Sequence, residues 1–218
     1  GMGVSRVEFA DGTVWNETTL IAMARAASGN AGSISGDELD NALSGGAGDD
    51  AIFGQGGADT LDGGIGSDLL QGGAGDDTYI FIANGGHDRI VDAGGNDTIL
   101  FAPEIRPADI AVQPSADGQD MVLIVKATGA RIAISGELGS GRVETVRFAD
   151  GTSWSFADLL ERAATVGDDR IVGDGADNVL AGAMGDDTLI GGAGNDTYMF
   201  ARGDGGDVII DGSNSLAD

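Results

Sequence analysis

Aspartate recurs at one fixed position of a nine-residue repeat, and it is the residue with the clearest chemistry in this sequence. Written as G-G-x-G-x-D-x-U-x, with U a large apolar residue, the repeat runs as GGAGDDAIF, GQGGADTLD, GGIGSDLLQ and GGAGDDTYI over residues 45–80. Its sixth positions are Asp50, Asp59, Asp68 and Asp77. Glycines allow a sharp turn that points carbonyl oxygens inward, and the aspartate adds a carboxylate. An all-oxygen set of this kind suits Ca²⁺, which takes 6–8 oxygens at about 2.3–2.6 Å.

The acidic column extends beyond these four units. A degenerate unit before them has Asn41 at the sixth position, and after residue 80 the frame slips by two residues and resumes with Asp88 and Asp97. A second array follows, with sixth positions Asp169, Asn178, Asp187 and Asp196, and with Asp207 after the same slip. Both slips come directly after a Tyr-x-Phe tripeptide, which indicates duplication of one module.

A Gly-Asp pair that stands alone is usually a solvated turn, but a column in fixed register favours metal ligation. The predicted ligand side chains are Asp50, Asp59, Asp68, Asp77, Asp88, Asp97, Asp169, Asp187, Asp196 and Asp207, with Asn41 and Asn178 as weaker, neutral substitutes. The predicted backbone ligands are carbonyl oxygens near Gly46, Gly48, Gly57, Gly64, Gly66, Gly73, Gly75, Gly185, Gly192 and Gly194. Aspartates at the fifth position (Asp49, Asp76 and Asp186) are expected to face solvent without a ligand role.

The elements that must position these ligands follow from the apolar eighth position. Residues seven to nine of each unit form a short strand whose middle side chain faces inward while its neighbours face outward. Two turns and two strands close one coil, and successive coils stack with parallel pairing, so unit n lies beside unit n+2. This predicts the stacked pairs Asp50–Asp68, Asp59–Asp77, Asn41–Asp59, Asp68–Asp88, Asp77–Asp97, Asp169–Asp187 and Asn178–Asp196.

These units resemble the RTX, or haemolysin-type calcium-binding, repeats of exported bacterial proteins. The resemblance implies an all-β fold, a parallel β-roll, with several Ca²⁺ ions between stacked turns. It also implies type I secretion, so that the protein is secreted or lies at the cell surface. The chain would then fold outside the cell, on binding calcium. The segment from about residue 99 onward resembles the spacer domain that accompanies such repeats.

Composition excludes several other classes of function. The net charge is −25, from 11 basic and 36 acidic residues, whereas nucleic-acid binding requires a basic face. There is no cysteine for a disulfide or a thiolate site, and no apolar run approaches the roughly 18 residues of a membrane span. The single histidine, His87, lies in a repeat turn that suits neither an HExxH zinc site nor a histidine-dependent triad. We therefore predict no catalytic residue and no enzyme; a carboxylate-only hydrolase is the alternative left open.

The segment between the two arrays predicts a small spacer or capping unit. Residues 121–126 and 130–135 are β-rich runs joined at Gly129, and residues 143–148 form another strand that ends at the turn of Asp150. Ser155 and Asp158 form a capping box before an amphipathic helix with Phe156, Leu159, Leu160 and Ala163 on its apolar side. The N-terminal stretch VEFADGTVW parallels VRFADGTSW at residues 146–154, and a helix is expected over about 17–27. Trp15 and Trp154 are expected to be core residues.

Four segments follow from this pattern: the tail of a preceding spacer with a helix (1–26), a first roll (27–100), a spacer or capping domain with a helix (101–163) and a truncated second roll (164–218). The thin apolar column and the repelling carboxylates predict a roll that is largely unfolded without calcium. The expected partners are calcium ions and further modules of the same longer chain. A calcium-dependent polysaccharide-binding module, like those that accompany alginate epimerases, or a stiff spacer of a surface adhesin, is the alternative function.

Overall fold

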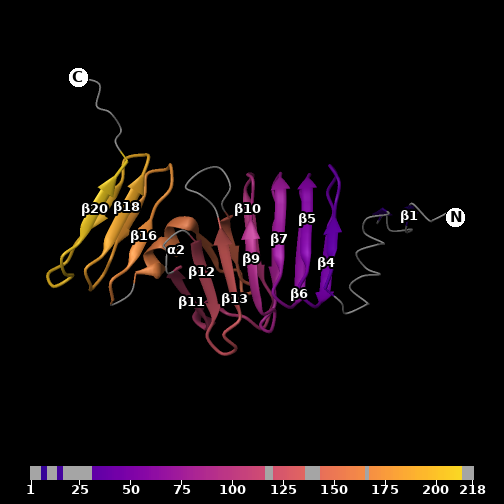
Figure 1. Cartoon of the computed structure of the whole chain (residues 1–218), viewed down its shortest axis with the longest axis horizontal. Coiled ribbons are helices and arrows are strands. Elements are labelled where there is room, and N and C mark those ends of the chain that lie inside the picture. Colours follow the sequence, from indigo (N-terminus) through magenta and orange to yellow (C-terminus); the bar gives the residue numbers. More distant parts are fainter. Residues whose placement is uncertain are drawn as a thin grey trace, which may run out of the picture.

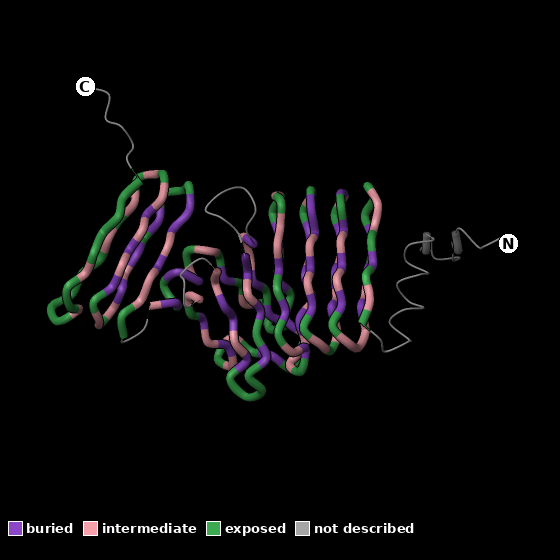
Figure 2. The backbone as a smooth tube through the Cα atoms, viewed as in Figure 1, coloured by how far each residue is buried: buried purple, intermediate pink, exposed green. Residues whose placement is uncertain are grey.

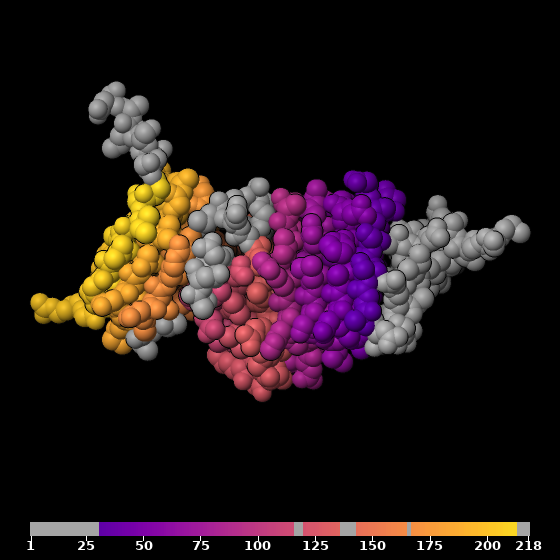
Figure 3. Space-filling view, viewed as in Figure 1, coloured from indigo at the N-terminus to yellow at the C-terminus, as the bar shows by residue number. Residues whose placement is uncertain are grey.

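The computed structural model describes residues 6–8, 14–16, 31–115, 120–135, 143–164 and 167–212. Within them the chain is almost entirely β, and its strands stand side by side along the long axis of the molecule (Figure 1). The two rolls lie towards opposite ends, with the spacer between them (Figure 3). The predicted all-β class and the parallel β-roll are confirmed.

The first roll consists of two parallel sheets whose strands alternate along the chain. One contains β4 (Ala42–Ala47), β6 (Thr60–Ile65), β8 (Thr78–Phe81) and β10 (Asp97–Phe101). The other contains β3 (Ser33–Ser35), β5 (Ala51–Gly56), β7 (Leu69–Ala74) and β9 (His87–Val91). Each strand therefore pairs with the strand two units away, as the nine-residue period predicts.

Side chains at the eighth position of the repeat form the inner wall of the roll. Leu61 pairs with Tyr79 and Tyr79 with Ile99, and all three are at most 1 % exposed. The two-residue slip leaves this register intact, because the turn that follows Phe81 takes up the extra residues before Ile90 pairs with Leu70. The core of the roll is thus narrow, with one buried side chain from each unit. Along the backbone these buried positions alternate with less buried ones (Figure 2).

The regular strands are longer than the three residues expected from the repeat. β5 and β6, for example, have six residues each and continue through the first three positions of the next unit. The extension forms because the first positions of stacked units also pair, as Gln55 does with Gly73. The tight turn is therefore confined to positions four to six and includes the aspartate.

The spacer continues both sheets of the first roll. β13 (Arg131–Ser135) adds in parallel to β9, and β14 (Val143–Arg147) adds in parallel to β10. The predicted hairpin is present as β12 (Asp120–Val125) paired antiparallel with β13, with Gly129 at a φ of 76° in its turn. β11 (Ile110–Pro114), which the sequence did not predict, follows a 3-10 turn at Pro107–Asp109 and pairs with β12. The predicted boundary at residue 100 stays a prediction, and the sheets run through it.

Aromatic side chains close the spacer end of the first roll. Phe81 meets Phe101 edge-on at 5.8 Å, and Phe101 stacks on Phe148 at 5.1 Å between ring centroids. Phe148 in turn meets Trp154, which lies in β15 (Ser153–Ser155) and is 5 % exposed. Trp154 is therefore a core residue, as predicted.

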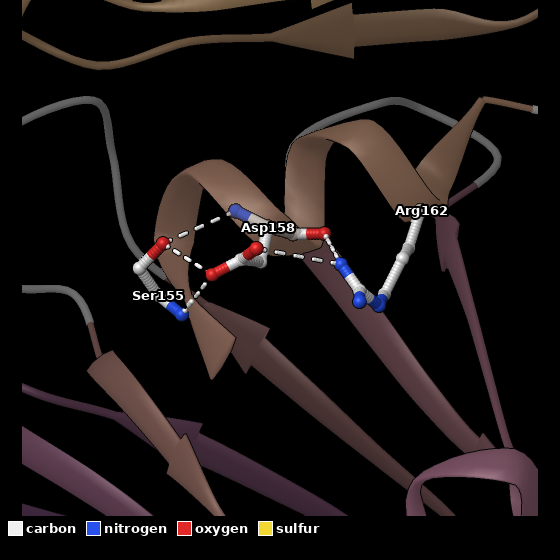
Figure 4. Close-up of polar contacts among 3 residues, drawn as sticks. All are labelled: Ser155, Asp158 and Arg162. Atoms are coloured by element: carbon white, nitrogen blue, oxygen red, sulfur yellow. Dashed lines mark hydrogen bonds and ion pairs between the residues drawn. The ribbon is translucent and has the colours of Figure 1, made fainter. Parts of the chain in front are cut away.

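The predicted helix is α2 (Phe156–Ala163), and its capping box is formed (Figure 4). The backbone N–H of Asp158 donates to Ser155 Oγ at 3.2 Å, and the backbone N–H of Ser155 donates to Asp158 Oδ2 at 2.8 Å. Arg162 lies one turn later, donates to the Asp158 carbonyl at 2.9 Å and covers the Trp154 ring at 4.5 Å. Leu159 and Ala163 are buried on the predicted apolar side.

The second roll repeats the first in a shorter form. β16 (Arg170–Val172), β18 (Thr188–Gly192) and β20 (Val208–Asp211) form one parallel sheet, and β17 (Val179–Ala181) and β19 (Thr197–Met199) form the other. Its small core consists of Leu160 from α2 with Ile171, Leu180 and Leu189. The outer strand β20 is exposed throughout (Figure 2), with Ile209 at 46 %.

The N-terminal β1 (Arg6–Glu8) and β2 (Val14–Asn16) pair antiparallel. Val7 lies opposite Trp15, in the same register as Val146 and Trp154 in the spacer, so the sequence parallel extends to the pairing. The helix expected over about 17–27 lies outside the described residues, as do the side-chain surroundings of Trp15. The divisions at residues 26 and 163 stay predictions.

Candidate metal centre

Within each roll, the sixth-position side chains form a ladder along each edge. In every rung a carboxylate Oδ1 accepts the backbone N–H of the sixth-position residue one coil earlier. The first-roll rungs are Asp50 N to Asp68 at 2.8 Å, Asp68 N to Asp88 at 3.0 Å, Asn41 N to Asp59 at 2.7 Å, Asp59 N to Asp77 at 2.7 Å and Asp77 N to Asp97 at 2.8 Å. The second-roll rungs are Asp169 N to Asp187 at 2.8 Å, Asn178 N to Asp196 at 2.9 Å and Asp187 N to Asp207 at 3.0 Å. All predicted stacked pairs are therefore brought together.

The second oxygen of most of these carboxylates is buried and, in the described part of the chain, has no hydrogen-bond partner. These atoms are Oδ2 of Asp50, Asp59, Asp68, Asp77, Asp97, Asp187 and Asp196. Folded proteins leave few buried polar atoms unsatisfied, and each one costs about 1–3 kcal/mol, more when it is charged. A whole row of such oxygens in fixed register has the chemistry of a cation-binding site.

Glycines leave room for these oxygens. A Cβ built on Gly45 would lie 2.5 Å from Asp50 Oδ2 and 2.7 Å from the carbonyl oxygen of Gly63, one coil later. A carboxylate oxygen and a turn carbonyl thus share the space beside a first-position glycine. Gly64 has a φ of +89°, and a side chain there would overlap the Gly46 carbonyl. Both kinds of glycine are needed so that oxygens of neighbouring coils can converge.

Electrostatics agrees with the geometry. Burial raises the pKa of Asp59, Asp68 and Asp77 to about 6, even though each accepts a backbone N–H that lowers it. Burial raises the pKa of Asp88 to about 7 and that of Asp97 to about 8, and neighbouring carboxylates add to both shifts. Carboxylates that are costly to ionise when bare would ionise readily around a divalent ion.

The fifth-position aspartates are exposed, as predicted, but they have a structural role that the sequence reasoning missed. Asp49 Oδ1 accepts the N–H of Ser67 at 2.8 Å, and Asp76 Oδ1 accepts that of Asn96 at 2.9 Å. They form an outer ladder that holds the turns in stack. In the repeated sequence GAGDD, the second aspartate is therefore the ligand candidate, and the first accepts a hydrogen bond from the turn of the next coil.

The asparagine units differ from the others in a second residue that the sequence reasoning also missed. Asn41 Oδ1 accepts the N–H of Asp37 at 2.8 Å, and its Nδ2 donates to Asp37 Oδ1 at 3.1 Å. Asn178 makes the same pair of bonds with Asp174, at 2.7 and 3.1 Å. An aspartate at the second position, where regular units have glycine, was the available signal.

The two edges of the first roll end differently at the spacer. On one edge Asp88 pairs with Ile132, a buried apolar residue. On the other, Asp97 N donates to Glu144 Oε2 at 2.7 Å, so a glutamate of β14 takes the place of the next aspartate. Glu144 was missed because it lies 47 residues from its partner, although its spacing to Val146 matches that of Asp97 to Ile99.

His87 is exposed at the start of β9, as predicted. No helix among the described residues is long and apolar enough to cross a membrane.

Family models match both the repeats and the spacer. The family model described as RTX calcium-binding nonapeptide repeat matches four copies, at residues 35–70, 53–81, 82–100 and 164–198. The model described as haemolysin-type calcium binding protein related domain matches residues 120–158. No curated protein matches the sequence. Among solved structures, the solution structure of the AlgE6R3 subunit from the Azotobacter vinelandii mannuronan C5-epimerase is 29 % identical and covers 49 % of this chain and 71 % of its own, with a TM-score of 0.38. The chain is therefore built of RTX haemolysin-type calcium-binding repeats together with a haemolysin-type calcium binding protein related domain.

Proposed function

We propose that this region is a non-catalytic β-roll of an exported bacterial protein that folds when it binds calcium outside the cell. The observation that carries the proposal is the row of buried Oδ2 atoms along both edges of the rolls, which have no hydrogen-bond partner among the described residues. RTX repeats are typical of extracellular bacterial proteins, where calcium is abundant. Sites of about 10⁻⁴–10⁻³ M affinity are sufficient there.

The residues fit a calcium ion chemically. Each interface between stacked coils would offer the carboxylates of its own sixth positions, with turn carbonyls beside them. Over both rolls these carboxylates belong to Asp50, Asp59, Asp68, Asp77, Asp88, Asp97, Asp169, Asp187, Asp196 and Asp207. Calcium would supply positive charge that replaces the water lost by these carboxylates on burial. The units of Asn41 and Asn178 are the weakest candidates, because their amide oxygens already accept a backbone N–H.

Two features of the chain act against folding without calcium. The inner wall holds one buried side chain per nine residues, which is little apolar burial for a chain with 40 glycines to order. The net charge of −25 adds repulsion between the stacked turns. Metal binding that occurs only in the folded state would shift this balance.

A far-UV circular dichroism titration tests the proposal. We expect a largely disordered spectrum in excess chelator and a β spectrum on addition of calcium, with magnesium as the control because it prefers rigid octahedral sites. A full β spectrum in chelator would contradict calcium-dependent folding. Polysaccharide binding, the alternative, stays a prediction that an alginate pull-down with and without calcium would check.

A further inference from the structure

One acidic edge of the first roll ends in a carboxylate cluster at the boundary with the spacer. Ligand oxygens of Asp77, Asp92 and Asp97 all lie within 4.8 Å of one another. Asp77 and Asp97 are sixth-position residues, whereas Asp92 occupies a first position, where the regular units have glycine. Oxygens on opposite sides of a Ca²⁺ ion are about 4.6–5.2 Å apart, so three carboxylates at this spacing suit a single ion.

Unpaired buried oxygens point to the same ligand independently. Asp77 and Asp97 are 1 % and 0 % exposed, and within the described chain neither Oδ2 atom has a hydrogen-bond partner. Exposed acidic groups can spread apart in solvent, but these two are fixed by their Oδ1 bonds to the ladder and by burial. When these carboxyls are ionised, a cation would satisfy both oxygens and offset the repulsion from Asp92.

Asp92 is held towards this cluster by three donors. The Tyr79 hydroxyl donates to Asp92 Oδ1 at 2.6 Å and itself accepts the Gly72 N–H at 2.9 Å. The N–H groups of Gly73 and Gly94 donate to the two Asp92 oxygens at 3.2 and 2.7 Å. Tyr79 is 1 % exposed, so this hydroxyl is a fixed part of the wall.

The second roll repeats the arrangement after its own slip. The Tyr198 hydroxyl donates to Asp211 Oδ1 at 3.0 Å, thirteen residues later, as Tyr79 does to Asp92. Asp196, the counterpart of Asp77, also has a buried Oδ2 without a partner among the described residues. In both rolls, the tyrosine that ends the regular array therefore donates a hydrogen bond to an aspartate that is not at a sixth position of the repeat.

Glu144 joins this end of the roll to the spacer. Its Oε2 accepts the Asp97 N–H, which is the bond that the next aspartate makes in every other rung. Val146 pairs with Ile99 and is 0 % exposed, so β14 forms a further coil wall in register. The opposite edge has Ile132 at this level and no equivalent carboxylate in the described pairing.

We propose that Asp77, Asp92 and Asp97 bind one calcium ion in a site richer in carboxylates than the glycine-turn sites, and that Glu144 couples its occupancy to docking of β14. The proposal rests on the proposed function but assigns two carboxylates outside the repeat's ligand column. The spacer would then dock more firmly on the roll when the last coil is loaded, so calcium would order the roll and its cap together.

Calcium titration of the whole chain by isothermal calorimetry tests the ligand assignment. Asp92→Asn should lose one ion or weaken it at least about tenfold. Asp76→Asn is the matched control, because it removes one charge from an exposed neighbour of Asp77 and should bind like the wild type. Identical titrations for the two variants would overturn this proposal alone. A wild-type chain that binds no calcium would instead overturn the proposed function.

Terbium luminescence provides a second, local readout. The chain has two tyrosines, so in a Tyr198→Phe background Tyr79 is the remaining tyrosine and lies beside the proposed site. Tyrosine-sensitised terbium emission should be strong there, should fall on addition of Asp92→Asn, and should saturate at higher terbium concentration with Glu144→Ala. Glu144→Ala removes the acceptor for the Asp97 N–H, whereas Glu144→Gln retains the rung and serves as its control. Unchanged terbium affinity in Glu144→Ala would overturn the coupling, and unchanged emission in Asp92→Asn would overturn the site.

Discussion

Asp68→Asn is the most informative change in the ladder, because Asp68 takes part in two rungs. Its Oδ1 accepts the N–H of Asp50 at 2.8 Å, and its own N–H donates to Asp88 Oδ1 at 3.0 Å. Asparagine retains the Oδ1 acceptor and replaces the unpaired Oδ2 by an amide group that cannot bind a cation. The variant therefore removes a proposed ligand from two coil interfaces while it leaves the backbone ladder in place.

The size of the effect follows from the number of interfaces. A tenfold weaker ion at one interface costs about 1.4 kcal/mol of stability at fixed calcium, so two interfaces cost about 2.8 kcal/mol. Asp88→Asn should cost about half as much, because Asp88 has a carboxylate neighbour on one side and pairs with Ile132 on the other. Asp49→Asn, at the exposed fifth position, should change stability by less than about 0.5 kcal/mol.

Urea denaturation at saturating calcium, combined with calorimetric counting of bound ions, measures these differences. The order of destabilisation should be Asp68→Asn, then Asp88→Asn, then Asp49→Asn. In excess chelator the order should disappear, since the lost interaction is with the metal. Equal ion counts and affinities in the wild type and Asp68→Asn would refute the assignment of ions to stacked sixth positions.

Three further predictions concern protons, glycine and the helix cap. Because burial raises the pKa of Asp59 and Asp77 to about 6, protonation stabilises the calcium-free roll. In chelator its stability should be greatest below the ordinary carboxyl pKa of about 4 and should be lost as the pH rises from there through about 6, and a β content that rises with pH in circular dichroism would contradict this sign. Gly54→Ala should lose or weaken the calcium ion beside Asp59, since the added Cβ would overlap Asp59 Oδ2 and lie 2.5 Å from the Gly72 carbonyl oxygen, whereas Gly175→Ala, which meets nothing within 4 Å, should bind as the wild type does in the same titration. Ser155→Ala should lower the unfolding free energy of the calcium-loaded chain by about 1 kcal/mol through loss of the helix cap, measured by urea denaturation, and Ser155→Asp should restore most of it; equal losses in both variants would argue against the cap.

The stacking could be predicted from the sequence because it depends on a local period. Every ninth residue takes an equivalent position on the opposite side of the coil and every eighteenth lies directly above it, so the eighth positions had to be buried and the sixth positions had to align between unit n and unit n+2. Leu61 beside Tyr79 and Asp50 beside Asp68 are consequences of that count. The slip after Phe81 did not disturb it, because the added residues are confined to one turn.

Contacts between segments outside the repeat were decided by the tertiary structure. Glu144 continues the Asp97 rung only because the spacer folds back and places β14 beside β10, and nothing in the repeat count refers to a residue 47 positions away. Asp37 and Asp92 break the glycine pattern of the repeat, yet each carboxylate is held by specific donors in the folded chain. By itself the sequence determined the repeating turns, the inner wall and the candidate calcium ligands, since all of these follow from one short period. Only the tertiary structure decided how the column of carboxylates ends, since that depends on which surface packs against the last coil.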